Sequence, residues 1–182
     1  MKKAYLFFAT GFEEVEALTV VDLLRRAGVD CKTVSVTGDY DVMGAHGITI
    51  RADKVFEEGN LEDAAMLILP GGIPGTPNLA AHRGLDQLIR CYFEAGKYLA
   101  AVCAAQTVYG EKGLLEGKKA TCYPGMEEGL KGAVALTDEV VCDGQFITSR
   151  GMGTSIAFGL KLIEKLVDQE TADQIGTKIV YK

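Results

Sequence analysis

Short apolar runs alternate with amphipathic stretches along the first half of the chain. The apolar runs that predict buried strands are residues 3–9, 31–36, 64–69 and 98–102, and the stretches with helical spacing between them are residues 13–27 and 78–95. Because these strands are continuously apolar rather than alternating, we expect both of their faces to be covered. Strands that alternate with helices also predict parallel pairing. The pattern therefore indicates an α/β fold with helices on both faces of a mainly parallel sheet.

Two further segments are expected to add strands at the edges. Residues 46–50 predict a short third strand on an edge of the sheet. Near the C-terminus, residues 139–142 and 145–149 flank Asp143-Gly144, a dipeptide that favours a hairpin turn. We therefore expect a small antiparallel hairpin beside the parallel strands.

The last predicted helix begins at a capping residue. Either Thr154 or Ser155 is expected to cap a helix that continues to about residue 167. The chain shows no linker, internal repeat or low-complexity segment. A single α/β domain over residues 1–182 accounts for the whole pattern.

Composition and charge narrow the function classes. Hydrophobic residues make up 48% and charged residues 24% of the 182 residues, which is ordinary for a soluble globular protein. The net charge of −6 argues against a nucleic-acid partner, and no Lys/Arg run suggests a membrane surface. The N-terminal residues lack the features of a signal peptide, and no apolar run reaches transmembrane length. These features predict a cytoplasmic protein.

Cysteine and histidine usage argues against disulfide and metal sites. The five cysteines are odd in number and none forms a CxxC pair, so we expect no disulfide framework or zinc site, and a reducing compartment. The two histidines, His46 and His82, have no ligand spacing, and both are expected at the surface. No metal is therefore expected.

Cys103 lies where an apolar strand turns into a helix-favouring stretch, within LAAVCAAQTVYG at residues 99–110. At such a position a thiol meets unpaired backbone N–H groups and the positive end of a helix dipole, so its pKa is expected to fall. The position resembles the nucleophile elbow of hydrolases, although the G-x-S-x-G pattern is absent. A buried structural cysteine is the other interpretation, and position alone leaves both open.

Glu16 lies on the helix face that is expected to contact the sheet. That face is defined by apolar residues at i, i+3, i+4 and i+7, namely Val20, Leu23, Leu24 and Ala27. Glu16 extends it by one turn toward the strand ends, so burial is expected to raise the pKa of its carboxyl. Such a group donates a hydrogen bond to a thiolate when protonated and acts as a base when ionised. The alternative, a preference of acidic residues for helix N-termini, explains Glu13 and Glu14 better than Glu16.

Two glycine-rich loops follow predicted strands. The backbone N–H groups of residues 70–75 (PGGIPG) are candidates for binding an oxyanion, although a plain turn is favoured when this loop is taken alone. Residues 151–155, with Arg150, are a weaker candidate anion site, and an ordinary helix cap is favoured there. Neither G-x-G-x-x-G nor a Walker A motif occurs, so nucleotide binding has no motif support.

Four segments together resemble one protein family. They are GFEEVEALTVVDLLRRAG (11–28), LILPGGIPG (67–75), LAAVCAAQTV (99–108) and TSRGMGTSIAFGLKLIEKL (148–166). In this order they resemble the ThiJ/PfpI superfamily, specifically its DJ-one branch, which includes the parkinsonism-associated deglycase and bacterial ThiJ-like proteins. The resemblance extends from Lys3 to about Val167.

The resemblance implies a fold and a site. The implied fold is a flavodoxin-like, class I glutamine-amidotransferase-like three-layer sandwich. The implied reactive residue is Cys103 in a strained elbow, with Glu16 as its carboxylic partner, and the N–H groups of Gly72 and Ala104 line an anion pocket, with Gly71 beside them. Members of this branch are usually homodimers. They are described as glutathione-independent glyoxalases, as deglycases or as redox-responsive chaperones, and no cofactor is implied.

The sequence departs from the family pattern at two positions. Ala104 stands where the intracellular-peptidase branch has a histidine, which argues against peptidase activity. Tyr123 stands before Pro124 where the DJ-one branch often has a histidine, and tyrosine is a poor base near neutral pH. His46 matches a position that holds a basic residue near the partner's pocket in dimeric relatives, so we expect an interface residue there. Tyr123, Arg150 and His46 are thus expected to support the site rather than to carry the reaction.

The leading hypothesis is a cysteine-dependent enzyme acting on small reactive carbonyls, a glyoxalase or deglycase, with Cys103 as nucleophile and Glu16 as proton shuttle. The alternative is a redox sensor or redox-regulated chaperone in which Cys103 is oxidised to a sulfinate. A third reading is a structural or interaction protein that kept the fold without the chemistry.

Overall fold

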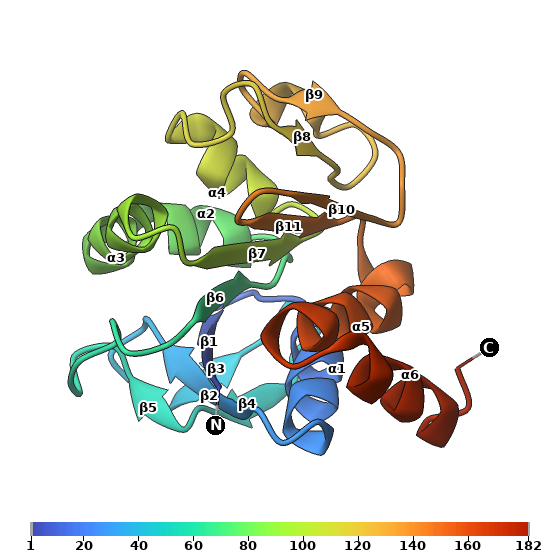
Figure 1. The fold of residues 1–182 in the computed structure, drawn as a ribbon. Helices are drawn as coiled ribbons and strands as arrows, with labels where there is room; N and C mark the ends of the chain where they lie inside the picture. Colours follow the sequence, from blue (N-terminus) through green and yellow to red (C-terminus); the bar gives the residue numbers. More distant parts are fainter. Residues whose placement is uncertain (1, 182) are drawn as a thin grey trace.

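A seven-stranded sheet forms the middle layer of the structure, a computed structural model that describes residues 2–181 (Figure 1). Its strand order is β10-β11-β7-β6-β1-β2-β5. The strands are β1 (Lys3–Phe8), β2 (Asp30–Ser35), β5 (Lys54–Val55), β6 (Met66–Leu69), β7 (Tyr98–Val102), β10 (Val140–Asp143) and β11 (Phe146–Ser149). All neighbours pair in parallel except β10, which is antiparallel to β11. The predicted parallel sheet with an antiparallel hairpin is confirmed.

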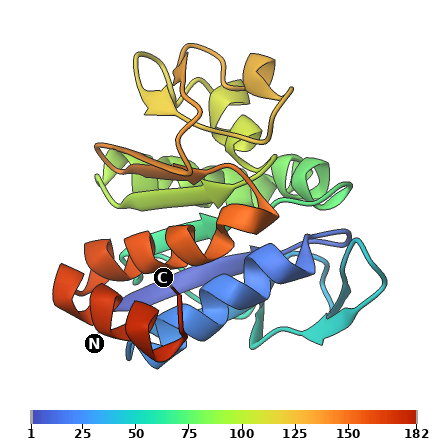
Figure 2. The ribbon, with the colours of Figure 1, turned by 90° about the vertical axis from the view of Figure 1, so that its right-hand side faces the viewer.

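Helices cover both faces of this sheet. On one face lie α1 (Glu14–Arg26), α5 (Ser155–Leu166) and α6 (Gln169–Lys178), and on the other lie α2 (Gly75–Ala81), α3 (Arg83–Glu94) and α4 (Gln106–Glu111) (Figures 1 and 2). Along β1, Leu6 and Phe8 belong to the core beneath α1 and α5, whereas Tyr5 and Phe7 belong to the core on the opposite face. Burial on both faces explains why the strands are continuously apolar, and the three-layer α/β sandwich is confirmed. Within residues 2–181, no helix is both long and apolar enough to cross a membrane.

The predicted helix over residues 78–95 is wrong in one respect, because the chain forms two helices there. His82 has an extended backbone (ψ 108°) and separates α2 from α3. Its ring nitrogen Nδ1 accepts a hydrogen bond from the N–H of Leu85 at 3.0 Å. The break therefore arises because His82 caps the second helix instead of continuing the first.

The expected edge strand at residues 46–50 is also corrected. β4 (Thr49–Arg51) pairs with β3 (Asp41–Met43) in a separate two-stranded antiparallel sheet, and the edge of the central sheet is β5. His46 lies in the turn of this hairpin, where Gly47 has φ +77°. A left-handed glycine bends the chain at the place where the predicted strand begins.

The C-terminal hairpin and helix follow the prediction with small shifts. Asp143 pairs with Phe146, so the turn residues are Gly144 and Gln145, one position later than expected. Thr154 precedes α5 but makes no side-chain hydrogen bond to that helix; its hydroxyl donates to the Gly151 carbonyl at 2.9 Å instead. Helix α6 was not anticipated from the sequence.

A smaller layer of short elements lies beyond β10 and β11. It holds β8 (Lys119–Ala120), β9 (Val134–Ala135) and the short 3₁₀ helix η1 (Glu127–Gly129), whereas a second such helix, η2 (Met152–Thr154), leads into α5. Figure 1 shows β8 and β9 above α4 and the β10–β11 hairpin. The segment after β8 lies beside the end of β7, where the N–H of Tyr123 donates a hydrogen bond to the carbonyl of Cys103.

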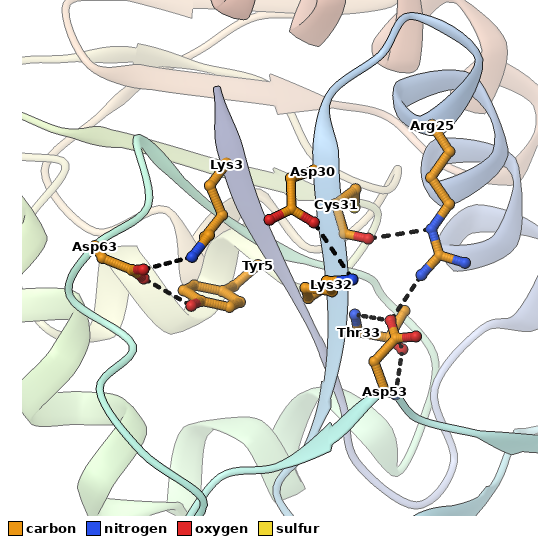
Figure 3. Close-up of polar contacts among 9 residues, drawn as sticks. All are labelled: Lys3, Tyr5, Arg25, Asp30, Cys31, Lys32, Thr33, Asp53 and Asp63. Carbon is orange, nitrogen blue, oxygen red and sulfur yellow. Dashed lines mark hydrogen bonds and ion pairs between the residues drawn. The ribbon is translucent and has the colours of Figure 1, made fainter. Parts of the chain in front are cut away.

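Two aspartates, Asp53 and Asp63, tie loops to the N-terminal strands (Figure 3). Asp53 accepts hydrogen bonds from the N–H and hydroxyl of Thr33 at 2.8 and 2.9 Å and from Arg25 at 2.6 Å. Burial alone raises the pKa of Asp53, but the Thr33 hydrogen bonds and the Arg25 charge outweigh it and hold that pKa below its ordinary value. Asp63 bonds Lys3 and the hydroxyl of Tyr5 in the same way. These contacts fix the loops before β5 and β6.

The order of strands reverses between β1 and β6. From β1 the chain continues outward to β2, and it later returns through β6 and β7 in the other direction. The loops after β1, β6 and β7 therefore meet at the carboxyl ends of three adjacent strands. In open parallel sheets this reversal point is where ligands bind.

Candidate active site

Cys103 directly follows β7 in a left-handed conformation with φ 66°, which is unusual for a residue other than glycine. Its N–H donates to the carbonyl of Ser149 at 3.0 Å, and its own carbonyl accepts from the N–H of Tyr123 at 2.9 Å. Such a conformation persists only where the surroundings enforce it, and it is common at functional sites. The expected strand-to-helix turn is present, and it leaves the Cys103 side chain partly exposed.

Glu16 points from α1 toward this turn. Its side chain is 1% exposed, and its Oε2 accepts a hydrogen bond from the N–H of Gly71 at 2.8 Å. The same carboxyl is hydrogen-bonded to the thiol of Cys103. The structure therefore brings together the cysteine and the glutamate that the sequence singles out, from helix and strand segments far apart in the chain.

The glycine loop after β6 closes around the cysteine. The N–H groups of Gly72 and Ala104 hydrogen-bond to the Cys103 sulfur. A Cβ added at Gly71 would lie 2.6 Å from the Cys103 Cβ and 2.7 Å from the Glu16 carboxylate. Only a residue without a side chain fits between them. Gly72 has φ +96°, a backbone conformation that glycine adopts without steric cost.

Burial shapes the titration of the pair. Burial raises the pKa of Glu16 to about 7, against the opposing hydrogen bonds from Cys103 and Gly71. Burial and the negative charge of Glu16 raise the pKa of Cys103 to about 12, although the Ala104 and Gly72 N–H groups lower it. The expected fall in the Cys103 pKa is therefore wrong. Since Glu16 supplies two of the three contributions that raise it, a thiolate is compatible only with protonated Glu16.

A second polar cluster lies at the start of α1. Glu14 is 3% exposed and accepts hydrogen bonds from the N–H and Nδ1 of His46 at 2.8 and 2.9 Å. The interpretation of Glu14 as a simple helix N-terminal acid is thus incomplete. The Glu14 hydrogen bond and the Glu13 charge raise the pKa of His46.

This cluster has residue types that ligate metals, and its candidate ligand atoms lie within 4.8 Å of one another. Oε1 of Glu14 already accepts hydrogen bonds from the backbone N–H groups of His46 and Ile48, Oε2 is bound to His46 Nδ1, and the α1 N-terminus is unfavourable for a cation. The arrangement explains how the β3–β4 hairpin is held on α1.

Tyr123 and Arg150 lie on the other side of the turn. Tyr123 is 52% exposed, and a Cβ at Gly151 would lie 3.4 Å from its ring. The charge of Arg150 lowers the pKa of Cys122, and it is not among the influences on Cys103. Tyr123 is thus placed beside the Cys103 turn, whereas the charge of Arg150 influences Cys122, the residue before Tyr123.

The chain resembles known proteins along its full length. The model of the DJ-1/PfpI family matches residues 2–165. Protein DJ-1 homolog B of Arabidopsis thaliana is 37% identical over 100% of this chain. The chain belongs to the DJ-1/PfpI family.

Within this family the relatives differ in length and in what their names state. The chain spans 42% of Arabidopsis homolog B and 47% of homolog A, so under half of each. A deglycase of Pyrococcus abyssi is 27% identical over 90% of this chain and 99% of its own length.

Solved DJ-1 structures share the fold. A mutant of a DJ-1 superfamily protein from Salmonella typhimurium has a TM-score of 0.96 at 31% identity and covers 100% of both chains. Oxidized DJ-1 of Toxoplasma gondii has a TM-score of 0.96 at 31% identity, covering 100% of this chain and 99% of its own. The flavodoxin-like DJ-1/PfpI architecture expected from the sequence is confirmed.

One residue of this DJ-1/PfpI site was missed by sequence reasoning. Gln106 is 0% exposed and lies three positions after Cys103. Its Nε2 donates to the carbonyls of Thr121 and Ser149. The available signal was a long polar side chain within the otherwise small and apolar stretch that follows the cysteine.

We predict that Glu16→Gln stabilises the protein at high pH. A carboxyl whose pKa is raised on folding stabilises the folded state fully below its unfolded pKa of 4.5, and this contribution is lost as pH rises through about 7. The shift corresponds to about 3 kcal/mol. Glutamine stays neutral, so the gain over wild type is expected to be large near pH 8 and small near pH 4.5 in urea unfolding. The exposed Glu94→Gln is the control, and a gain from Glu16→Gln that did not depend on pH would contradict the prediction.

We also predict that Gly71→Ala and Gly153→Ala differ. Neither glycine has a left-handed φ, so alanine strains neither backbone. A Cβ at Gly71 meets Cys103 and Glu16, whereas a Cβ at Gly153 meets no atom within 4 Å. Gly71→Ala is expected to destabilise by about 1–3 kcal/mol and to slow alkylation of Cys103, while Gly153→Ala stays within about 0.5 kcal/mol of wild type. Equal effects in urea unfolding and alkylation would refute this account of Gly71.

Proposed function

We propose that the protein is a cysteine-dependent enzyme that acts on small reactive carbonyl compounds such as methylglyoxal, without glutathione or another cofactor. One observation carries the proposal. The Cys103 sulfur, the Glu16 carboxyl and the N–H groups of Gly72 and Ala104 converge at the carboxyl ends of adjacent strands. A nucleophile, an acid–base group and oxyanion donors are the parts that carbonyl chemistry requires.

The first step is addition of the Cys103 thiolate to the aldehyde carbon. A carbon–sulfur bond forms, and the aldehyde oxygen takes the electron pair and then a proton from Glu16, giving a hemithioacetal. The N–H groups of Gly72 and Ala104 are supported as oxyanion donors because both already hydrogen-bond at the sulfur. Glu16 is left ionised and ready to accept a proton.

The second step is a proton transfer between neighbouring carbons. Glu16 removes the proton from the carbon bonded to sulfur and returns it to the adjacent carbon. The hemithioacetal hydroxyl gives its proton to the former ketone oxygen, so that the ketone becomes an alcohol and the hydroxyl carbon becomes the thioester carbonyl. The product is a thioester of lactate on Cys103. A carboxyl with a pKa near 7 suits both directions of this transfer at neutral pH.

The third step is hydrolysis of the thioester. Water adds to the thioester carbon, the carbon–sulfur bond breaks, and lactate leaves while the thiol is regenerated. The overall reaction is methylglyoxal plus water to lactate, with no net oxidation or reduction. The partly exposed Cys103 side chain supports access for water.

The same nucleophile also suits removal of a glycation adduct from a protein, the deglycase reaction. A relative from Pyrococcus abyssi is named a deglycase, which supports hydrolytic chemistry in the family. We place the glyoxalase reaction first because it uses only the groups described above. Peptidase activity is disfavoured, since Ala104 follows the cysteine.

A redox sensor or redox-regulated chaperone is the second candidate. Cys103 is partly exposed beside a carboxyl able to hold a proton, and a structural relative from Toxoplasma gondii is described as oxidized. Two equivalents of peroxide would convert the thiolate to a sulfinate, each reduced to water, and protonated Glu16 would donate a hydrogen bond to it. Turnover is not needed for this role.

We propose that the protein acts as a homodimer. Four large apolar side chains are exposed where the β3–β4 hairpin meets α1: Val15, Leu18, Met43 and Ile48. A second copy of the chain, brought to this patch beside His46, would cover them. A monomeric mass in sedimentation would overturn this assignment.

The five free cysteines support a reducing, cytoplasmic compartment.

The decisive test is lactate formation from methylglyoxal without added thiols. Cys103→Ser is expected to lose activity to background, and Glu16→Gln to lose roughly 100-fold or more, since positioned proton transfer contributes that much. The exposed, free Cys142→Ser is the matched control and is expected to keep full activity. Full activity in Cys103→Ser or Glu16→Gln would refute the mechanism. Wild-type turnover no higher than that of Cys103→Ser would favour the redox candidate, with Tyr123 the first residue to change.

A further inference from the structure

Gln106 links two segments that lie far apart in the sequence. It is the first residue of α4 and is completely buried. Its side-chain nitrogen Nε2 donates to the carbonyl of Thr121, just after β8, at 2.9 Å. It also donates to the carbonyl of Ser149, at the end of β11, at 2.5 Å. One amide group therefore holds both segments beneath the turn.

The same two segments hold the backbone of Cys103. The Ser149 carbonyl accepts the N–H of Cys103 as well as the amide of Gln106. The Cys103 carbonyl accepts the N–H of Tyr123, two residues after Thr121. Both peptide groups of the left-handed cysteine thus depend on partners that Gln106 positions.

An uncharged amide is well suited to this position. Two carbonyl oxygens must be satisfied by one nitrogen, and a glutamine NH₂ group carries two N–H donors. A glutamate would place an oxygen against two carbonyl oxygens in a buried site. A methionine fills a similar volume but leaves the Thr121 carbonyl without this donor.

The Cys103 sulfur has little room to move without losing its partners. Cys103 and Glu16 fill the space that a Cβ at Gly71 would occupy. The N–H groups of Gly72 and Ala104 hydrogen-bond to the sulfur. A small rotation of the turn therefore weakens several contacts together.

We propose that Gln106 is a positioning residue that sets the reactivity of Cys103 by clamping Thr121 and Ser149 around its left-handed turn. The inference rests on the proposed function in taking Cys103 as the nucleophile. It goes further in assigning the geometry of that nucleophile to a residue that touches neither substrate nor sulfur.

Gln145 provides a matched control. Its Nε2 also donates to backbone carbonyls, those of Tyr92, Phe93 and Lys97, but at the opposite end of β11. Gln106→Met and Gln145→Met each remove one side-chain amide that donates to backbone carbonyls, the first at the C-terminal end of β11 and the second beside its N-terminal end. Both variants are expected to lose stability in urea unfolding, and only the first is expected to change Cys103.

The readout is the rate of Cys103 alkylation by iodoacetamide between about pH 6 and 9, followed on its own peptide by mass spectrometry. Gln106→Met is expected to react about tenfold more slowly at neutral pH, the effect of one lost hydrogen bond, with its pH profile displaced upward. Gln145→Met is expected to match wild type. Equal rates and profiles in the two variants, whether both fall or neither does, would overturn the proposal.

Two additions keep the test decisive. Should Gln106→Met not fold, Gln106→Asn keeps the amide but shortens its reach by one methylene, and it is expected to react more slowly than wild type; a wild-type rate would overturn the proposal. Alkylation needs no turnover. A wild type that reacts at Cys103 yet forms no lactate would refute the proposed glyoxalase reaction while the comparison of Gln106 with Gln145 still stands.

Discussion

The hydrogen bond between the Cys103 thiol and the Glu16 carboxyl is the contact on which the rest of the site depends. Both groups are acids in a largely buried place: the Glu16 charge raises the pKa of Cys103, whereas the hydrogen bond from the thiol lowers the pKa of Glu16. Two neighbouring buried negative charges are costly, so the pair holds one proton and one charge near neutral pH. A site with that property supplies a nucleophile and a proton donor together, which addition to a carbonyl needs.

The fold makes this contact by bringing three strand ends together. β1, β6 and β7 are adjacent and parallel, so the loops after them meet where the strand order reverses. One loop leads into the helix that carries Glu16, the second supplies Gly71 and Gly72, and the third is the left-handed turn at Cys103. The absence of a side chain at Gly71 matters as much as the presence of the two acids, because any Cβ there would separate them.

The strands and helices with a clear apolar period were predictable, and so were the candidate functional residues that follow the strands. Continuous apolar runs gave the strands, and the spacing of Glu16 from the apolar face of its helix placed it inward. Contacts between distant segments were not predictable, because no local pattern encodes them. Gln106 is such a case, since its two acceptors come from other strands. The rise in the Cys103 pKa likewise arises from burial and the charge of the distant Glu16. The helix break at His82 is local, since its ring caps the N–H of Leu85 three residues on, but helical spacing alone does not reveal it.

The most direct test of the shared proton is a pH titration of the Cys103 thiolate by ultraviolet absorbance, taken as wild type minus Cys103→Ala. Because burial and the Glu16 charge both raise the pKa of Cys103, the thiolate signal of wild type is expected to rise with a midpoint well above the ordinary thiol value of 9.0. In Glu16→Gln burial still opposes the thiolate but the neighbouring charge is gone, so the midpoint is expected to move downward by about one unit or more. A wild-type midpoint at or below 9.0, or a midpoint that stays the same or rises in Glu16→Gln, would contradict the account.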